Sequence, residues 1–491
     1  MKYSKFLFPC VLLWVSLVFS QDGSPDVTFG NNGSVITNIE GESKEYPQNI
    51  IQRPNGGILV AGVSVDNEDS GMLVSYLPDG TIDPSFGTDG VVLLSNVTFR
   101  EIAIQQNENI IATNRTLSDF DIYRFSPDGS QDFSFGTNGT IKPFTNFEPQ
   151  SSMLLLPDDQ IIAAATINEN GSEVVQLKKF LVDGNLDNSF GNSGTVEISI
   201  GNQETELREL KVSGSNILVL TKIRDSGITS YKIVRLLPTG EIDASFGSNG
   251  IAEISIEDLF QIRSMAVYDN GDFVILSAFI DSIEETTSNR ISKYTSNGQI
   301  DTSFGDNGLL TFDPSSITMH KLMIQTDDKI VYLGELTNFF EGGGPSVLGR
   351  LHLDGTLDSS FTQTEALNFE IFVVSGLLQT DDKIVVVAFT AWYSGVEDIV
   401  LERYNNSSTL STSDYLQDEF TITPNPSRGI FAIQHRYKNG DIYPFKIFDQ
   451  QGREIWNDVL LDSEGSIDLS GFANGIYFIR SGEITKKLVK F

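Results

Sequence analysis

Short apolar segments separated by turns of glycine, asparagine and aspartate recur along most of the chain. In one stretch, apolar residues at 102–105 and 110–113 flank a polar turn at 107–109. A third apolar segment follows at 121–125, and residues 139–141 open a fourth. Short apolar runs divided by such turns are typical of strands in an antiparallel meander. We therefore predict an all-β chain built from units of four short strands.

A motif of the form Asp-x-Ser/Thr-Phe-Gly, called here the anchor motif, recurs once per unit. Consecutive copies lie 49 to 58 residues apart, a period that indicates repeated supersecondary units. The last copy has Thr362 in place of the glycine. We expect the seven anchor phenylalanines to be structural and to point into the core: they are Phe29, Phe86, Phe135, Phe190, Phe246, Phe304 and Phe361.

The residue types around the anchor motif suit a tight turn. In the second copy, Gly80 follows Asp79, and glycine adopts a positive φ at no steric cost. Asp83 is expected to accept hydrogen bonds from backbone N–H groups near Ser85, as in an Asx-turn. Such aspartates could instead bind Ca²⁺, although their spacing lacks the D-x-[DN]-x-[DN]-G pattern of a calcium loop. We predict no cofactor, with Ca²⁺ as the alternative.

The two ends of the repeat region complement each other. The apolar segment 400–404 is followed by no complete anchor motif, whereas an unpaired anchor at Phe29 leads into a segment at 33–37. Four-stranded sheets repeated radially form a β-propeller. We predict a seven-bladed β-propeller in which the N-terminal strand completes the last blade and leaves no open sheet edge. An open solenoid is the alternative.

The remaining segments define the other predicted domains. Residues 1–20 have the features of a signal peptide, because Lys2 and Lys5 precede an apolar run at 6–19. The predicted propeller spans 21–405, and a Ser/Thr-rich linker spans 406–417. Alternating apolar residues and turns at 418–491 indicate a small C-terminal β-sandwich. No later apolar segment is long enough to cross a membrane.

The net charge argues against one class of partner, and the cysteine content argues against disulfides and thiol chemistry. The chain has 33 basic and 66 acidic residues, a formal net charge of −33. Nucleic-acid binding requires a basic footprint, so we predict no nucleic-acid partner. Cys10, inside the predicted signal peptide, is the only cysteine, so neither disulfides nor thiol chemistry is expected in the mature chain.

The repeat resembles the delta-60 repeat family of exported bacterial proteins over about residues 22–405. The resemblance rests on Gly-x-x-Asp-x-Ser-Phe-Gly, on the Asp-Gly-Lys-Ile-like hairpin, and on an Arg-aromatic pair before the anchor, as at Arg124-Phe125 and Arg403-Tyr404. The family implies a repeat architecture rather than an activity.

The C-terminal segment resembles the type A C-terminal sorting domain of the type IX secretion system found in Bacteroidota. Its motifs, Pro-Asn-Pro-x-x-Gly, Asp-x-x-Gly-Arg, Gly-Ile-Tyr and a lysine-rich end, occur in order. The resemblance implies export by the type IX secretion machinery, via the periplasm, followed by surface anchoring or release. The matching positions are Pro424, Asn425, Pro426, Gly429, Asp449, Gly452, Gly475, Tyr477 and Lys487.

Functional residues gather on loops held by a rigid scaffold, so we expect a site on the variable loops between the second and third strands of each unit. These loops are rich in acids and hold aromatic residues on which a sugar or a peptide could stack; the alternative is that these residues pack the loops. They are Phe339, Phe340, Trp392 and Tyr393. His320, His352 and His435 form no cluster in the sequence, His352 is expected in a third strand, and no nucleophile motif stands beside them, so no catalytic residue is predicted.

The sequence is compatible with three functional hypotheses. The first hypothesis is a secreted or cell-surface binding and adhesion scaffold without catalysis, whose ligand is a surface glycan or a protein. The alternative is a secreted glycan hydrolase or lyase with an acidic site at the propeller mouth. The third is a structural surface-layer component.

Overall fold

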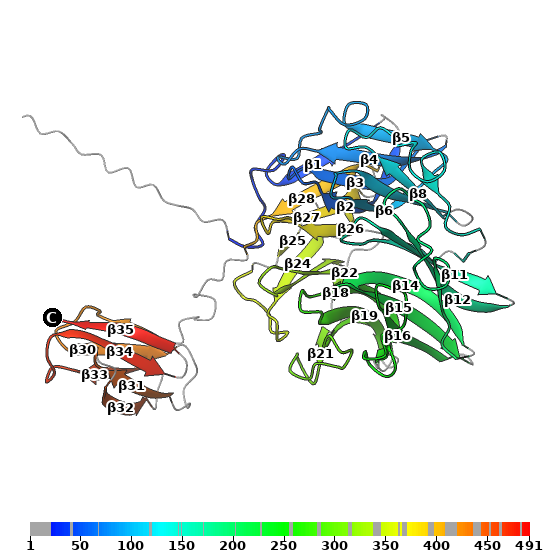
Figure 1. Cartoon of the computed structure of the whole chain (residues 1–491). Coiled ribbons are helices and arrows are strands. Elements are labelled where there is room, and N and C mark those ends of the chain that lie inside the picture. Colours follow the sequence, from blue (N-terminus) through cyan, green and yellow to red (C-terminus); the bar gives the residue numbers. More distant parts are fainter. Residues whose placement is uncertain are drawn as a thin grey trace, which may run out of the picture. The chain divides into compact units, whose positions relative to one another are not determined.

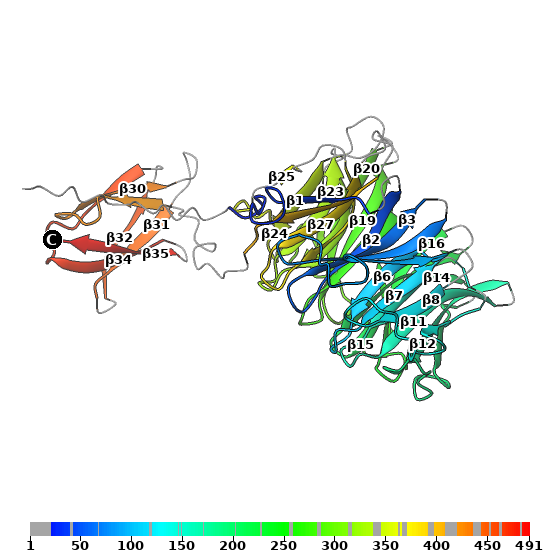
Figure 2. The ribbon, with the colours of Figure 1, turned by 90° about the horizontal axis from the view of Figure 1, so that it is seen from above.

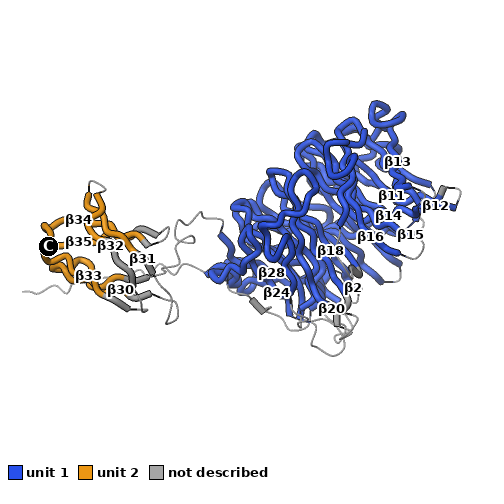
Figure 3. The backbone as a smooth tube through the Cα atoms, turned by 90° about the horizontal axis from the view of Figure 1, so that it is seen from below, with its two compact units in different colours: residues 1–408 blue, residues 409–491 orange. Residues whose placement is uncertain are grey.

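The computed structural model describes residues 21–39, 43–66, 68–116, 120–145, 147–148, 150–169, 171–201, 203–225, 228–254, 259–281, 286–312, 317–336, 345–361, 364–365, 371–390, 397–407, 420–435, 443–450, 453–460, 464–481 and 484–491. Within these ranges every helix or strand is a β-strand, which confirms the predicted all-β class (Figure 1). The chain divides into two compact units, residues 1–408 and 409–491, described separately here (Figure 3). The predicted signal peptide and residues 408–419, which include most of the predicted linker, lie outside the described residues.

The described part of unit 1 forms seven four-stranded antiparallel sheets. In six of them the four strands are consecutive in the sequence, as the meander pattern predicted. These sheets contain β2 (Lys44–Gln52), β3 (Ile58–Val65), β4 (Asp69–Tyr76) and β5 (Val91–Ser95); β6 (Phe99–Ile104), β7 (Ile110–Arg115), β8 (Phe120–Phe125) and β9 (Thr140–Ile141); β10 (Ser151–Leu155), β11 (Ile161–Glu169), β12 (Ser172–Phe180) and β13 (Thr195–Ile198); β14 (Glu204–Ser213), β15 (Asn216–Asp225), β16 (Ile228–Leu236) and β17 (Ile251–Ile254); β18 (Leu259–Val267), β19 (Phe273–Asp281), β20 (Thr286–Tyr294) and β21 (Leu309–Phe312); β22 (Ile317–Ile324), β23 (Ile330–Leu336), β24 (Ser346–Leu351) and β25 (Thr364–Glu365).

The remaining sheet of unit 1 joins the two ends of the repeat region. It contains β26 (Ile371–Leu378), β27 (Ile384–Thr390) and β28 (Ile399–Tyr404), and its fourth strand is β1 (Ser34–Thr37). β1 pairs antiparallel with β28, from Ser34 opposite Glu402 to Thr37 opposite Ile399, and the two lie side by side in Figure 1. The N-terminal strand therefore completes the last sheet, as predicted.

The sheets follow one another around a closed ring (Figures 1 and 2). The first strand of each sheet contacts the first strand of the next, and β26 contacts β2. We call these strands the inner strands: β2, β6, β10, β14, β18, β22 and β26. A ring of four-stranded sheets is the architecture of a β-propeller.

All seven anchor phenylalanines are buried, with at most 5% of their surface exposed. The first six anchors each pack against the turn of the following repeat. Gly87 donates its N–H to the carbonyl of Asp128 at 2.7 Å. At Gly129, which has a φ of +85°, a Cβ atom would lie 3.0 Å from the ring of Phe86. This close approach explains why the turn before the anchor requires glycine.

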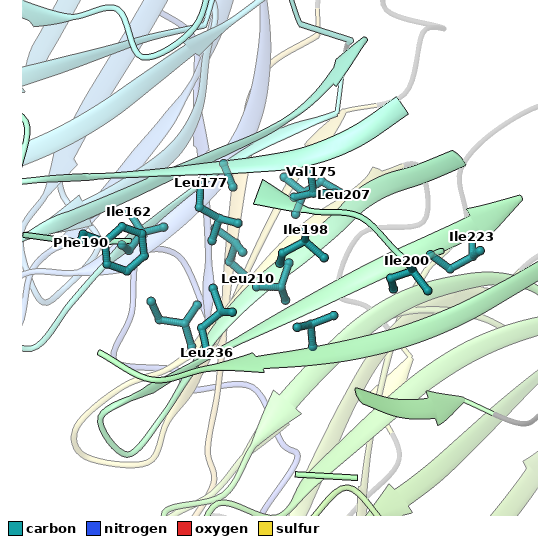
Figure 4. Close-up of a cluster of buried hydrophobic side chains, with 14 residues drawn as sticks. Ile162, Val175, Leu177, Phe190, Ile198, Ile200, Leu207, Leu210, Ile223 and Leu236 are labelled. Atoms are coloured by element: carbon teal, nitrogen blue, oxygen red, sulfur yellow. The ribbon is translucent and has the colours of Figure 1, made fainter. Parts of the chain in front are cut away.

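Apolar side chains fill the space between neighbouring sheets. Figure 4 shows one such layer between the third and fourth sheets. Leu177 of β12 and the anchor Phe190, which precedes β13, meet Leu207 and Leu210 of β14 there. The second strands carry continuous buried runs, such as residues 58–62 and 384–388, because both of their faces are covered.

Unit 2 is a small sandwich of two sheets, which confirms the fold predicted for the C-terminal segment. One sheet has the order β29-β30-β33 and the other β32-β31-β34-β35. Phe431, Ile447, Ile467 and Ile479 form its buried core with Leu488. The strands are β29 (Phe420–Thr423), β30 (Ile430–His435), β31 (Tyr443–Phe448), β32 (Glu454–Leu460), β33 (Glu464–Asp468), β34 (Gly475–Ser481) and β35 (Ile484–Lys490).

Two local predictions need correction. The strand expected at 102–105 begins earlier, at Phe99, because the Phe99 ring packs edge-on against Phe125 at 5.7 Å. His352 lies just after β24, not within it, and its backbone N–H starts the next turn by bonding to Thr356.

Candidate functional site

The anchor aspartates hold the local turn, as the Asx-turn prediction required. In the second copy, Asp83 Oδ1 accepts hydrogen bonds from the Ser85 backbone N–H at 3.1 Å and the Ser85 hydroxyl at 2.6 Å. The same pair of bonds recurs in the other six copies, where Ser or Thr stands two residues after the aspartate.

Each anchor aspartate forms an ion pair with a lysine or arginine side chain. The sequence pattern did not reveal this pairing. In most repeats this cation lies near the end of the third strand. Arg124, for example, donates to Asp132 at 2.8 Å and to the carbonyl of Val182 in the next repeat at 2.6 Å, and it lies over Phe135. The pairs are Arg403–Asp26, Arg53–Asp83, Arg124–Asp132, Lys179–Asp187, Arg235–Asp243, Lys293–Asp301 and Arg350–Asp358.

These contacts leave the anchor aspartates engaged with protein groups. The described residues contain no group of three or more His, Cys, Asp or Glu side chains that could hold a metal ion. The pKa of every anchor aspartate lies below its usual value. At Asp243 the Ser245 hydroxyl is the largest cause. At Asp26, burial alone would raise the pKa, but Thr28, Lys383 and Arg403 outweigh it and lower the pKa to about 2.

This arrangement predicts a pH-dependent contribution to stability. A carboxyl whose pKa is lowered in the folded state stabilises it above the unfolded pKa, near 3.9, and loses that contribution as pH falls through the folded pKa. We expect Asp243→Asn to destabilise the protein by about 1–3 kcal/mol at pH 6. The difference in stability between the variant and wild type should shrink as pH falls below about 4 and through the lowered pKa of folded Asp243, because protonated Asp243 then resembles asparagine. The difference in stability is obtained from the urea midpoints of both proteins, measured from pH 6 downward. A difference that does not change with pH would contradict the prediction.

The aromatic residues proposed to stack a sugar, Phe339, Phe340, Trp392 and Tyr393, lie outside the described residues. Two acids at the edge of the same loop region are engaged in structure. The Glu397 side chain is fully buried and pairs with Lys44 at 2.9 Å, and Asp398 accepts a hydrogen bond from Asn38 at 2.8 Å. These two residues connect the N-terminal segment to the last sheet.

The inner strands present one equivalent position in each of the seven sheets. In each sheet, one residue of the inner strand pairs with the first isoleucine or phenylalanine of the second strand. The equivalent position lies four residues before that paired residue, in the inner strand. In six sheets the strand register shifts at this residue, which is the mark of a β-bulge. Bulges redirect a side chain out of the regular strand pattern. We call these residues the bulge ring: Gln48, Arg100, Ser151, Arg208, Arg263, His320 and Val374.

A cavity of about 600 Å³ opens beside the bulge ring. Arg208, Arg263, His320 and Val374 line it from four consecutive inner strands, together with Glu209 and neighbouring residues. A second hollow of about 350 Å³ is lined by Arg115, Ser151 and the same Arg208. Cavities of this size are typical of small-molecule sites.

Cations outnumber carboxylates in these linings, although acids outnumber bases two to one in the whole chain. Glu209 is the carboxylate in the lining of the larger cavity, and it is already engaged. It lies 2.8 Å from Lys211 and accepts the Met265 backbone N–H at 3.0 Å. Burial lowers the pKa of Arg263, which is the direction expected for a positive charge in a partly dehydrated site.

Other charged groups near the ring hold neighbouring inner strands together. Glu101 accepts the Met153 backbone N–H at 2.6 Å, and burial raises its pKa. Lys321 donates to Ser375 and to the Gly376 carbonyl at 2.7 Å, and burial lowers its pKa to about 8. His320 Nε2 lies 3.4 Å from Glu335 Oε1.

Sequence inspection missed the bulge ring because its members look like isolated polar residues in short apolar strands. An alignment of the repeats on their hairpins would have shown a column that reads Gln, Arg, Ser, Arg, Arg, His and Val. His320 therefore belongs to a cluster in space, although the sequence placed no partner beside it.

The residues of the predicted sorting motif stabilise unit 2. The Asn425 side chain donates to the Lys487 carbonyl at 2.6 Å and accepts the Val489 N–H at 2.9 Å. Asp449 accepts the Arg453 N–H at 2.9 Å across the β31–β32 turn, and the Tyr477 hydroxyl donates to the Ala473 carbonyl at 2.6 Å. Pro424, Pro426 and Gly429 belong to the segment between β29 and β30, Gly475 begins β34, and Gly452 lies outside the described residues.

Two protein families match parts of the chain. A family described as a domain of unknown function (DUF5122) beta-propeller matches residues 53–86, 156–190, 325–361 and 379–413. The secretion system C-terminal sorting domain matches residues 421–491. The chain therefore consists of β-propeller repeats followed by a secretion-system sorting domain, as both resemblances implied. The sorting domain indicates secretion or export to the cell surface.

Solved structures with similar folds share little sequence with this chain. The polysaccharide lyase Uly1 is 12% identical, with a TM-score of 0.48, over 73% of this chain and 90% of that one. The propeller domain of the Trilobed protease from Pyrococcus furiosus is 8% identical, with a TM-score of 0.45, over 74% and 94%. A chain of the complex of Drosophila Plexin A with Semaphorin 1b is 9% identical, with a TM-score of 0.42, over 78% of this chain and 88% of that one. No curated protein sequence matches the chain.

In the part of the chain that the structure describes, there is no helix of the length and apolar character that crossing a membrane requires.

Proposed function

We propose that this protein is exported through the periplasm by the type IX secretion system and acts outside the cell as a non-catalytic binding scaffold. The predicted domain limits belong to this proposal: a signal peptide at 1–20, a binding propeller at 21–405, a linker at 406–417 and a sorting domain at 418–491. The ligand enters the cavity at the bulge ring. The observation that carries the proposal is that four consecutive inner strands contribute equivalent residues to one hollow.

The chemistry of the lining supports binding rather than acid–base catalysis. Glycoside hydrolysis uses two carboxyl groups that flank the scissile bond. Glu209 already bonds to Lys211 and to a backbone N–H, so it serves the structure of the ring. Arginine, histidine, threonine and glutamine side chains in the same lining can orient a ligand through hydrogen bonds.

A ligand screen on the mature full-length chain tests this proposal. Oligosaccharides, peptides and Ca²⁺ are compared by thermal shift, because a ligand at 100 times its Kd stabilises the folded state by about 2.7 kcal/mol. Val374→Trp, which would fill the cavity, is expected to abolish the shift. Val27→Trp is the matched control, because Val27 is exposed. A shift that survives Val374→Trp would place the ligand elsewhere, and release of cleaved products would favour the enzyme alternative.

A further inference from the structure

The bulge ring contains three arginines, and none of them forms an ion pair with a carboxylate among the residues that the structure describes. Arg100 donates to Gln48 at 2.7 Å, whereas Arg208 and Arg263 line the larger cavity. Arg208 forms no hydrogen bond or ion pair in the part of the chain that the structure describes, although it lines both hollows. Arg263 donates to the Met319 carbonyl at 2.8 Å, which leaves its charge uncompensated by any ion pair among the described residues. Arg208 and Arg263 are half-buried, whereas the fully buried Arg350 bonds to aspartate.

We propose that the cavity binds an oxyanion group, a carboxylate, sulfate or phosphate, of a small ligand through Arg208 and Arg263. This inference deepens the proposed function and rests on it, because it names the chemistry that the binding site recognises. The planar fork of guanidinium donors matches two oxygen atoms of such a group and binds it in a defined orientation.

The neighbouring charges favour an anion over a cation. Glu209 forms an ion pair with Lys211 at 2.8 Å, and Glu335 lies 3.4 Å from His320, so both carboxylates already contact protein side chains. Lys321 is a further cation in the same inner strands, held by Ser375 and Gly376. A cation in the cavity would lie beside two arginines, and Glu209, the carboxylate of the lining, is already paired with Lys211.

The bulges explain how several repeats contribute to one site. Arg208 and Arg263 stand at the same register position of β14 and β18, and His320 stands at that position of β22. The β-bulge in each strand turns these side chains toward the cavity, whereas Leu207 and Leu210 of β14 pack between sheets. Radial repetition thus converts residues more than 50 positions apart into one cluster.

The cationic lining of the cavity contrasts with the whole chain, in which acids outnumber bases two to one. A strongly acidic protein repels small anions at long range, so retention of an anion needs a local site with direct donors. Because the charge contacts are short-range and partly dehydrated, binding should persist at moderate ionic strength, unlike loose attraction to a basic surface.

Isothermal titration of the mature full-length chain tests the inference. The probes are digalacturonate, inorganic sulfate and inorganic phosphate, with neutral cellobiose as the uncharged comparison. Arg208→Gln is expected to weaken binding of the preferred anion by about ten- to a hundredfold. Its melting midpoint should match that of wild type, because Arg208 bonds to nothing in the described structure. Lys142→Gln removes the same charge from an exposed position, 69% exposed, and should leave binding unchanged.

The possible outcomes separate this inference from the proposed function. Anion binding that Arg208→Gln abolishes and Lys142→Gln spares supports both, and the preferred probe identifies the oxyanion. Equal weakening by both substitutions, or binding of cellobiose alone in the cavity, would overturn the oxyanion inference; in the second case the binding function would still hold. If no anion binds while the wider ligand screen finds another ligand that Val374→Trp blocks, only the oxyanion inference fails. If neither experiment finds a ligand, both proposals fail.

Discussion

Phe135→Ala is expected to lower the free energy of unfolding of the propeller unit by about 3–5 kcal/mol. The Phe135 ring is fully buried in the layer between the second and third sheets, together with Ile111, Ile122 and Phe180. The Arg124 guanidinium lies over this ring, 4.6 Å from its centre. Truncation would leave a cavity that these rigid strands cannot close.

The same repeat supplies a matched control. Phe133 stands two residues earlier and is 69% exposed, so Phe133→Ala should change stability by less than about 0.5 kcal/mol. Urea denaturation monitored by fluorescence measures both variants. Similar midpoints for Phe135→Ala and Phe133→Ala would show that the anchor phenylalanine is not a structural element of the repeat.

Arg350→Ala is expected to destabilise the propeller unit by a similar amount, about 3–5 kcal/mol. The Arg350 side chain is fully buried and donates to Asp358 at 2.7 Å and to Asn406 at 2.6 Å, and it lies 2.9 Å from Asp22. In five of the other repeats the equivalent cation donates to a carbonyl in the turn of the next repeat. Here the first and last described segments of unit 1 replace that turn, so one guanidinium joins both ends of the ring.

Loss of Arg350 would leave buried carboxylates with fewer partners and would loosen the closure of the ring. Lys142→Ala is the control, because Lys142 is exposed and its pair with Asp121, at 3.3 Å, is of the kind worth less than about 1 kcal/mol. Urea midpoints compare the two variants with wild type. A midpoint for Arg350→Ala close to that of Lys142→Ala would mean that closure depends on the β1–β28 pairing alone.

Several parts of the fold could be predicted because they depend on local chemistry. The turn at Asp83 needs only hydrogen bonds to Ser85, two residues away, and those bonds form wherever the motif occurs. The pairing of β1 with β28 followed from counting, since one end of the repeat region lacked the strand that the other end carried in excess.

The candidate site could not be predicted in the same way. Arg208 and Arg263 are 55 residues apart (263 − 208) and carry no local signature. Their meeting depends on bulges and on the ring. The partners of the anchor aspartates also escaped prediction. In the second repeat Ser75 occupies the place of the usual cation, and Arg53 from the neighbouring hairpin approaches Asp83 instead, at 3.5 Å. Arg53 can replace the usual cation only because the fold places it next to Asp83.

The sequence by itself determined the β class, the repeat, the closing strand, the buried anchors and the sorting domain. These features follow from apolar alternation, turn chemistry and motif order, which act over a few residues and repeat along the chain. Only the tertiary structure decided where the cavity lies and that its wall is cationic. The reason is geometric: the ring brings the inner strands side by side, and β-bulges at equivalent positions turn several of their side chains into a common space.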